Sequence, residues 1–372
     1  MKLNFGLLIA ALALLLSACT GGSTGGGRGV AGDGMIAEAR LLHIERCEGY
    51  TLATMGDPWQ GGVLHRYVLV PAADTLPAQL PQGTVVRTPL HRALVYSSVH
   101  TSVMKELGMF ASVRGVCDTR FFTDSAVLAG VARGEIADCG DSMSPTVERV
   151  IAMQPDGILL SPYQDATYGQ VTKLDIPIIE CADYMESTPL GRAEWIKFYG
   201  LLLGKEREAD SIYAEVVASY TAIRDSAAQA TRKPMVLTEM VLNGVWNVPG
   251  GQSYMARILQ DAGGSYPWAD DRSTGSLNLD FNQVLARAQQ ADVWLIKSFY
   301  VHSYSDLKGA YALNDQFRAF QQRKVYVCDT NESRLFEQFP FHPDRLLRDY
   351  FIIFHPELQP AGAATRYFSP LP

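Results

Sequence analysis

The sequence contains 372 residues, of which 47% are hydrophobic and 19% are charged, and this composition excludes global disorder. The length is typical of two domains. With 32 Lys and Arg against 39 Asp and Glu, the formal net charge is −7, and the sequence has no basic tail of the kind that binds nucleic acid. We therefore expect a globular protein that does not bind nucleic acid.

The first residues are organised like an export signal. Lys2 precedes an apolar run over residues 5–16, which is short for a membrane-spanning helix but typical of a signal peptide. Residues 16–19 read Leu-Ser-Ala-Cys and resemble the bacterial lipobox, which implies that residues 1–18 are removed and that Cys19 is lipidated. The alternative is an ordinary secretory signal in which Cys19 is incidental. The lipobox predicts a lipoprotein anchored to a membrane, in the periplasm or at the cell surface.

A glycine-rich segment follows the lipobox. Residues 20–34 are dominated by Gly, Ser and Thr, so we expect residues 19–40 to form a flexible tether between the lipid and the folded part. Residues 21–25 formally match the G-x-S-x-G motif of hydrolases. That motif requires a strand before it and a helix after it, and a glycine-rich tether supplies neither. We therefore predict no hydrolase site here.

The remaining cysteines carry little functional information. They are Cys47, Cys117, Cys139, Cys181 and Cys328. Their number is odd and they form no C-x-x-C pair, so the spacing of zinc and iron–sulfur sites is absent. Export permits a disulfide, for which Cys117 with Cys139 is the first pair to test, while buried free thiols account better for most of them.

After about residue 40, short apolar runs alternate with helical patterns, which predicts an α/β fold with parallel sheets. The expected strands form two sets. The first set covers residues 67–70, 93–96, 112–116, 157–160 and 178–180, and the second covers residues 235–241, 293–297 and 325–328.

Helical patterns separate these two sets. Apolar residues recur at helical spacing over residues 192–203 and again from 206 to about 225, and the second pattern predicts a helix of about 30 Å. We interpret this helix as a strut between two lobes, although it could also pack as one more layer of a sheet. The predicted fold is α/β, with two Rossmann-like lobes joined by a single long helix and a ligand cleft between them. The expected boundaries are residues 41–190 for the first lobe, 191–233 for the linking segment and 234–372 for the second lobe.

Several segments have a distinctive order along the chain. They are residues 93–101 (ALVYSSVHT), 107–108 (LG), 113–116 (VRGV), 144–156 (SPTVERVIAMQPD), 255–264 (MARILQDAGG) and 342–358, which begin with His-Pro-Asp and end with His-Pro-Glu-Leu. As an ordered set they resemble the substrate-binding proteins of ABC importers for ferric siderophores, haem and cobalamin. The resemblance runs from about residue 90 to 358. It implies a monomeric carrier of a metal chelate, with no enzymatic activity and no resident cofactor, that delivers its ligand to a permease served by a separate ATPase.

The resemblance also implies where the permease is contacted. Members of the family present an acidic residue on the outer face of each lobe to permease arginines. Glu148 occupies the position in the first lobe, where a plain helix-start role is the alternative. The matching position of the second lobe is Gln260, with Asp261 beside it, so this docking face departs from the family's pattern.

Ligands of this family are large and partly apolar, so we expect aromatic walls with a few polar anchors. The candidate ligand-binding residues follow predicted strands and are Tyr163, Trp246, Phe299, Tyr300 and Arg334. For each aromatic residue, packing in the core or at a rim is the alternative. Phe336, Phe339 and Phe341 could equally line the cleft or cover the core, and His302 or Tyr163 could ligate haem iron.

Two other function classes remain open. An exported metal-dependent enzyme or free-metal receptor would require His65, His91 and His100 to converge, because no clustered ligand motif is present. A surface lipoprotein that binds a sugar or another partner is the third hypothesis. The sequence does not contain a P-loop, which agrees with an ATPase on a separate subunit.

Overall fold

The computed structural model describes residues 35–360 and 362–372. The lipobox with Cys19, the tether up to residue 34 and the hydrolase-like motif lie outside the described residues. Among the residues that are described, no helix combines the length and the apolarity that crossing a bilayer requires.

The first lobe contains a parallel sheet with the strand order β11-β10-β5-β6-β7. Both of its faces are covered, and strands of that kind are continuous apolar runs in the sequence, as in the fully buried Gly157–Leu160. Its strands are β5 (Ala93–Val95), β6 (Val113–Val116), β7 (Ala137–Asp138), β10 (Gly157–Leu160) and β11 (Ile178–Glu180). Its helices are α1 (Ser98–Glu106), α2 (Ser125–Ala132) and α3 (Val147–Met153), and β8 (Gly140–Asp141) pairs with β9 (Ser144–Pro145).

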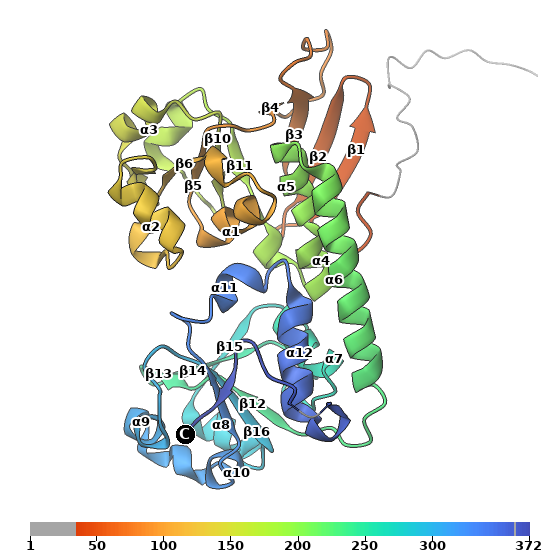
Figure 1. Cartoon of the computed structure of the whole chain (residues 1–372), viewed down its shortest axis with the longest axis vertical. Coiled ribbons are helices and arrows are strands. Elements are labelled where there is room, and N and C mark those ends of the chain that lie inside the picture. Colours follow the sequence, from red (N-terminus) through yellow and green to blue (C-terminus); the bar gives the residue numbers. More distant parts are fainter. Residues whose placement is uncertain (1–34, 361) are drawn as a thin grey trace, which may run out of the picture.

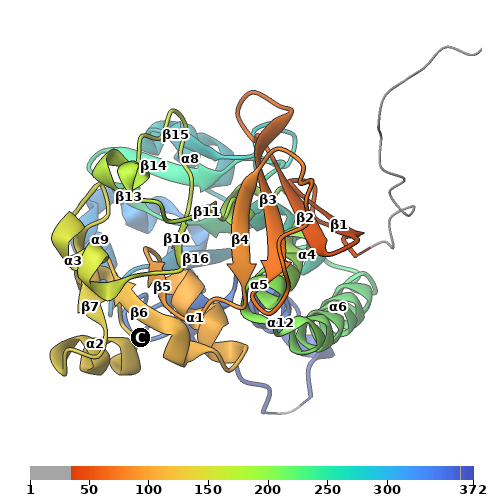
Figure 2. The ribbon, with the colours of Figure 1, turned by 90° about the horizontal axis from the view of Figure 1, so that it is seen from above.

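A separate sheet with the order β1-β2-β3-β4 lies beside this lobe (Figure 2). Its strands are β1 (Leu42–Cys47), β2 (Tyr50–Gly56), β3 (Val63–Pro71) and β4 (Thr84–Thr88). The first three are antiparallel, and β4 joins β3 in parallel. Placing the strand at residues 67–70 in the parallel sheet was wrong, since it is part of β3. An apolar run predicts a strand but not its partners. Strand β3 pairs antiparallel with β2 instead, after a tight turn in which Gly61 and Gly62 have φ values of 76° and 82°.

Three helices link the lobes: α4 (Pro189–Glu194), α5 (Ile196–Leu203) and α6 (Glu206–Ala227). Helix α6 has 22 residues and is therefore about 33 Å long. Ala209, Tyr213 and Val216 of its first half belong to the core of the first lobe. Tyr220, Ile223 and Ala227 of its second half belong to the core of the second lobe. One helix thus serves two cores, and the predicted strut is confirmed (Figure 1).

The second lobe contains a sheet with the order β12-β16-β17-β18, in which the first three strands are parallel and β18 is antiparallel. A smaller antiparallel sheet has the order β13-β14-β15. The strands are β12 (Val236–Thr238), β13 (Val241–Leu242), β14 (Val245–Pro249), β15 (Ser276–Leu279), β16 (Val293–Lys297), β17 (Val325–Cys328) and β18 (Ser369–Pro370). The predicted strand over residues 235–241 is divided because Glu239 has a left-handed backbone, with a φ of 62°.

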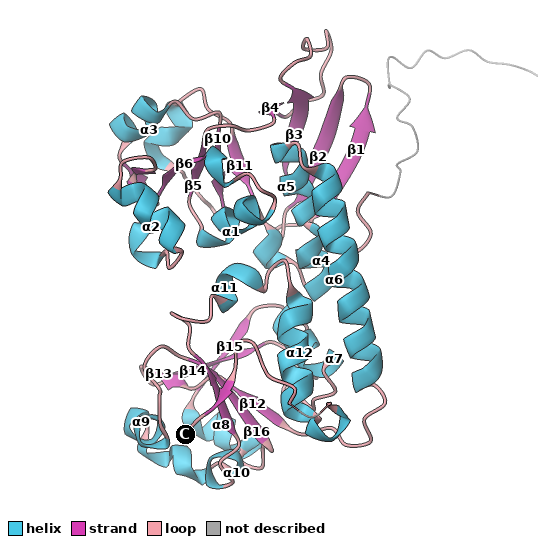
Figure 3. Ribbon diagram, in the orientation of Figure 1, coloured by secondary structure: helices cyan, strands magenta, loops and turns pink. Residues whose placement is uncertain are grey.

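The helices of the second lobe are α7 (Tyr254–Asp261), α8 (Phe281–Ala288), α9 (Tyr304–Ala310), α10 (Arg318–Gln321), α11 (Leu335–Gln338) and α12 (Pro343–Phe354). Helix α12 packs against α6 and α7. Figure 3 shows α4, α5, α6 and α12 on one side of the molecule, next to the sheets of both lobes. The lobes are therefore joined along a helical side.

Two buried carboxylates hold the first described residues against this helical side. Glu194, which is fully buried in α4, accepts the backbone N–H groups of residues 37–39 at 2.7–3.0 Å. Glu186 accepts those of residues 40 and 41 at 2.9–3.0 Å. Hydrogen bonds from N–H groups to an ionised carboxylate are among the stronger ones in proteins, so residues 37–41 are held firmly. We call these residues the strap.

Candidate functional site

A cleft of about 850 Å³ is lined by residues of both lobes and of the linking helices. Val99 of α1, together with Tyr184 and Met185, lines it from the first lobe, and Arg192 lines it from α4. The second lobe supplies most of the wall, which is largely apolar and aromatic. Its larger wall residues include Tyr254, Met255, Phe299, Tyr300, Phe336 and Phe339. The cleft therefore has the size and the walls expected for a bulky, partly apolar ligand.

A charged pair lies at the carboxyl edge of the second lobe's parallel strands. Glu239 follows β12 and Lys297 ends β16, and the Lys297 ammonium donates a hydrogen bond to the Glu239 carboxylate. Both side chains line the cleft and are 22% and 16% exposed, respectively. The Trp294 indole N–H donates to the carbonyl oxygen of Glu239 at 2.6 Å and so fixes its left-handed backbone. Parallel strands bind ligands at this edge, so the pair lies where a ligand would contact it.

Arg192 is a second charged group of the cleft, but it is held tightly. Its Nε donates to Oδ2 of Asp183 at 3.2 Å, and these side chains are only 8% and 2% exposed. The guanidinium also lies 5.1 Å from the ring centre of Tyr254 and 5.2 Å from that of Phe339. Cation–π contacts at these distances are stabilising, so Arg192 stabilises the aromatic wall of the cleft.

Glu186 is the fourth charged residue that contacts the cleft. Its carboxylate accepts the strap N–H groups of Arg40 and Leu41, and it also accepts the indole N–H of Trp195 at 3.0 Å. Because the carboxylate is already engaged by three donors, it is a poor acceptor for a ligand. Burial beside Asp183 raises the pKa of the neighbouring Tyr184, whose hydroxyl donates to the carbonyl oxygen of Pro162.

Some residues predicted for ligand binding do line the cleft. Phe299 and Tyr300 follow β16, are 58% and 41% exposed, and pack edge to face with ring centres 5.3 Å apart. Phe336 and Phe339 also line it, whereas Phe341 is buried against Tyr199 in the core. Of the two alternatives for these phenylalanines, lining the cleft applies to Phe336 and Phe339, and packing in the core applies to Phe341.

The prediction that Trp246 contacts the ligand was wrong. Its side chain is fully buried, its indole N–H donates to the carbonyl oxygen of Thr238 at 2.9 Å, and its ring stacks on Trp294 at 5.7 Å. The residue lies on β14, where buried and exposed positions alternate, and it faces the core. This strand was not among those predicted, and Trp246 was expected only to follow the strand at residues 235–241.

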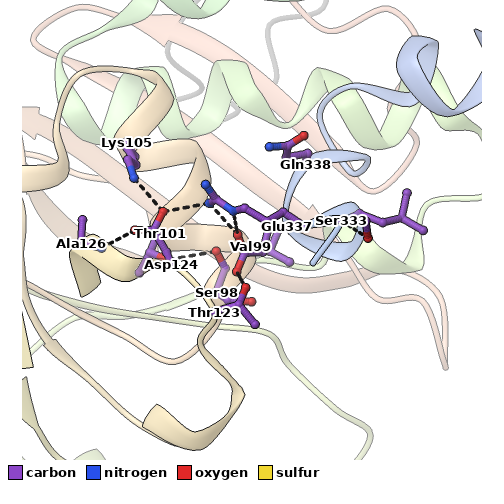
Figure 4. Close-up of polar contacts among 12 residues, drawn as sticks. Ser98, Val99, Thr101, Lys105, Thr123, Asp124, Ala126, Ser333, Glu337 and Gln338 are labelled. Atoms are coloured by element: carbon purple, nitrogen blue, oxygen red, sulfur yellow. Dashed lines mark hydrogen bonds and ion pairs between the residues drawn. The ribbon is translucent and has the colours of Figure 1, made fainter. Parts of the chain in front are cut away.

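Arg334 does not line the cleft either, because it is engaged by carboxylates of both lobes. Its Nη2 lies 2.8 Å from Oδ2 of Asp124 in the first lobe and 2.6 Å from Oε2 of Glu337 in its own lobe. Lys105 donates to Asp124 at 2.7 Å, and the Thr123 hydroxyl donates to Glu337 at 2.9 Å (Figure 4). We call these five residues the clasp.

The carboxylates of the clasp are well shielded, with Asp124 5% and Glu337 6% exposed. Burial opposes the ionisation of Asp124, but the Lys105 hydrogen bond, the Ala126 N–H and the Arg334 charge outweigh it and lower the pKa of Asp124. Near the clasp, Nε2 of His342 lies 2.6 Å from Oε1 of Glu106 and forms a further contact between the lobes. The first and second lobes are therefore fixed to each other by charged side chains beside α11.

The predicted docking residues lie on both lobes. Glu148 is exposed in the first turn of α3, and Gln260 is exposed near the end of α7. Asp261 is partly enclosed, because its carboxylate accepts the Tyr220 hydroxyl at 2.8 Å and lies 3.4 Å from Nε of Arg257. Gln260 is thus the freer of the two second-lobe candidates, and docking remains a prediction.

Tyr163 and His302 are separate from the cleft lining. Tyr163 is exposed on the loop after β10, where its ring lies edge to face with Tyr168 at 6.2 Å. His302 lines a different hollow of about 430 Å³ in the second lobe. Neither residue is placed to bind a ligand in the 850 Å³ cleft as the structure stands.

The cysteines and histidines in the described part of the chain do not form a metal centre. Cys117 and Cys139 are buried free thiols, so the disulfide that we considered is not formed, and burial raises the pKa of Cys139 to about 11. Burial also lowers the pKa of His100, whose ring packs against Tyr199. Within the described ranges, no group of three or more His, Cys, Asp or Glu side chains could hold a metal ion.

Residues 96–332 match the sequence model of a family described as periplasmic binding protein. A periplasmic heme-binding protein of Roseiflexus sp. RS-1 in apo form is 22% identical, with a TM-score of 0.56 over 72% of this chain and 99% of that one. A periplasmic heme binding protein of Pseudomonas aeruginosa is 15% identical, with a TM-score of 0.58 over 76% of this chain and 98% of that one.

A curated relative covers more of the chain. An uncharacterized lipoprotein of Methanocaldococcus jannaschii is 25% identical over 338 residues, which are 84% of this chain and 79% of the relative. The sheet β1–β4 precedes the residues that match the family model.

Proposed function

Since this chain belongs to the periplasmic binding protein family, we propose that it is a lipid-anchored carrier that captures a bulky metal chelate and delivers it to an ABC permease. The ligand would be a ferric siderophore, haem or cobalamin, and a separate ATPase would supply the energy. Members of the family are transport-related binding proteins and not enzymes. The family therefore opposes the alternative of an exported metal-dependent enzyme.

The cleft is the observation that carries this proposal. It is lined from both lobes, has a volume of about 850 Å³ and presents aromatic side chains such as Phe299 and Tyr300. Volumes of this size hold ligands of several hundred daltons. The clasp and α6 fix the lobes beside it, so we expect ligand binding with only a small closure.

Lipid anchoring is supported by the lipobox at residues 16–19 and by the relative that is named a lipoprotein. Delivery to a permease is supported by the exposed positions of Glu148 and Gln260 on different lobes. A permease that contacts both lobes could sense their spacing, and the charge of Glu148 would mainly orient and accelerate docking.

A binding screen tests the proposed function. The purified protein is titrated calorimetrically with cyanocobalamin, haemin, a ferric tris-hydroxamate and a ferric tris-catecholate, and we expect one of these chelates to bind with a stoichiometry of one. If all four fail while the protein carries stoichiometric zinc or manganese without a chelator, the protein is a free-metal receptor and the proposal is wrong. Lipid attachment is tested separately, because Cys19→Ala should release the protein from the membrane fraction.

A further inference from the structure

The charged residues that line the cleft balance one another. In the part of the chain that the structure describes, they are Glu186, Arg192, Glu239 and Lys297, which comprise two acids and two bases. Each of them also has a partner within the protein. The cleft therefore offers a ligand no unpaired charge.

Two of these groups are fixed parts of the fold. Glu186 is 3% exposed and is engaged by the strap and by Trp195. Arg192 is 8% exposed and is paired with Asp183, which is 2% exposed. Withdrawing either group from its partner would leave a buried charge uncompensated, which is strongly destabilising. A ligand therefore cannot bind to Glu186 or Arg192 without breaking contacts that stabilise the fold.

The pair of Glu239 and Lys297 is different because it is more exposed and lies at the carboxyl edge of β12 and β16. A strongly anionic chelate that binds to Lys297 must either displace the Glu239 carboxylate or share the ammonium with it. In both cases the chelate and the carboxylate repel each other in a site with apolar walls, where charges are poorly screened. A chelate of low net charge meets the pair as a dipole and can accept a hydrogen bond from Lys297 without separating it.

On the basis of the proposed carrier function, we infer that the cleft selects a bulky chelate of low net charge, and that Glu239 determines this selectivity by neutralising Lys297. The apolar wall residues Met240 and Leu242, which come one and three residues after Glu239, favour a ligand with an apolar body at the same place. The net charge of −7 adds a weaker, long-range repulsion of polyanions.

Affinities for two chelates of similar size but different charge test this inference. The probes are ferrichrome, which is an uncharged ferric tris-hydroxamate, and ferric enterobactin, which is a tris-catecholate with three negative charges. We expect the unmodified protein to bind ferrichrome at least about tenfold more tightly. Glu239→Gln keeps the shape of the side chain and removes its charge, so the affinity ratio should shift by about tenfold or more toward the trianion.

Control variants separate the effect of the Glu239–Lys297 pair from the effect of the protein's overall charge. Glu215→Gln removes one negative charge from the exposed face of α6, and it should leave the affinity ratio unchanged. Adding Lys297→Met to Glu239→Gln should cancel the gain for the trianion. The comparison of both probes on the unmodified protein requires no variant, so it tests the inference even if Glu239→Gln does not fold.

The outcomes are distinguishable. Tighter binding of the trianion by the unmodified protein, or an unchanged ratio in a folded Glu239→Gln variant, would overturn the inference and leave the carrier function intact. If neither these probes nor cyanocobalamin nor haemin bind, both the inference and the carrier function are wrong.

Discussion

The cleft and the clasp both involve residues of the α11 segment, but their ion pairs differ. The clasp includes a pair that joins the two lobes, whereas that of the cleft lies within one lobe. Leu335, Phe336 and Phe339 from this segment line the cleft, whereas Arg334 and Glu337 belong to the clasp. In the clasp, charged groups of different lobes neutralise each other. In the cleft, Glu239 and Lys297 both belong to the second lobe, so their ion pair does not connect the two lobes. One short segment therefore fixes the lobes on one side and leaves room for a ligand on the other.

The largest expected effect is on the clasp. Asp124→Ala removes the acceptor of Lys105 and Arg334 and the N-cap of α2, so we expect the free energy of unfolding to fall by about 3 kcal/mol. Urea denaturation measures the change. The matched control is Asp315→Ala, which removes an exposed partner of Lys308 and should cost less than about 0.5 kcal/mol. Equal losses in the two variants would show that the clasp is no stronger than a surface ion pair.

A change in the cleft should lower ligand affinity and leave stability nearly unchanged. Phe299→Ala removes a largely exposed ring from the wall, so we expect chelate affinity to fall about tenfold, or ~1.4 kcal/mol, with little change in stability. Calorimetric titration and urea denaturation measure the two quantities. Phe121→Ala serves as the control, because Phe121 is 67% exposed on the first lobe and does not line the cleft. A loss of stability without a loss of affinity in Phe299→Ala would argue against its role in the wall.

Acid should weaken the charged contacts between the lobes, namely the clasp at Asp124 and the contact of Glu106 with His342. Burial opposes the ionisation of Glu106, but the hydrogen bond and charge of His342 outweigh it and lower its pKa, as the contacts of Asp124 do for that residue. Because the pKa of each carboxyl is lower in the folded state, its stabilisation is complete above the unfolded pKa and is lost as the pH falls through the folded value. We expect a loss of about 1 kcal/mol per group below about pH 4.

Denaturation of Asp124→Asn at several pH values isolates one of these groups. The variant should show a shallower loss of stability below about pH 4 than the unmodified protein. Parallel curves for the two proteins would mean that Asp124 does not contribute to acid unfolding.

The smallest expected effect lies outside both regions. Glu148→Ala should leave chelate affinity unchanged and reduce uptake by cells about two- to fivefold, since exposed charges mainly assist encounter. Uptake of radiolabelled chelate and calorimetry measure the two effects. Equal losses of affinity and uptake would show that the docking face is located elsewhere.

The parallel strands could be predicted because burial on both faces makes them continuous apolar runs, as in residues 157–160 and 293–297. The helix α6 could be predicted from its apolar spacing. The partners of the strand at residues 67–70 and the strand β14 with Trp246 could not, because alternation in short antiparallel strands is a weak signal. Lys297 ended a predicted strand and could have been found from that position alone.

Contacts across the lobes were beyond the reach of the sequence. Arg334 was predicted to bind the ligand, and this was wrong because its partner Asp124 is far away in the chain and lies in the other lobe. Such a pairing depends on how α11 is positioned against α1, which no local pattern encodes. The same applies to Arg192, whose aromatic neighbours Tyr254 and Phe339 come from separate helical segments of the second lobe.

The strap has a mechanical consequence. Its backbone is hydrogen-bonded to Glu194 and Glu186, which lie at the start of the linking helices and not at the outer end of either lobe. A force applied to the chain at Met35 would therefore be transmitted to the helices that link the lobes, and not to the outer end of either lobe.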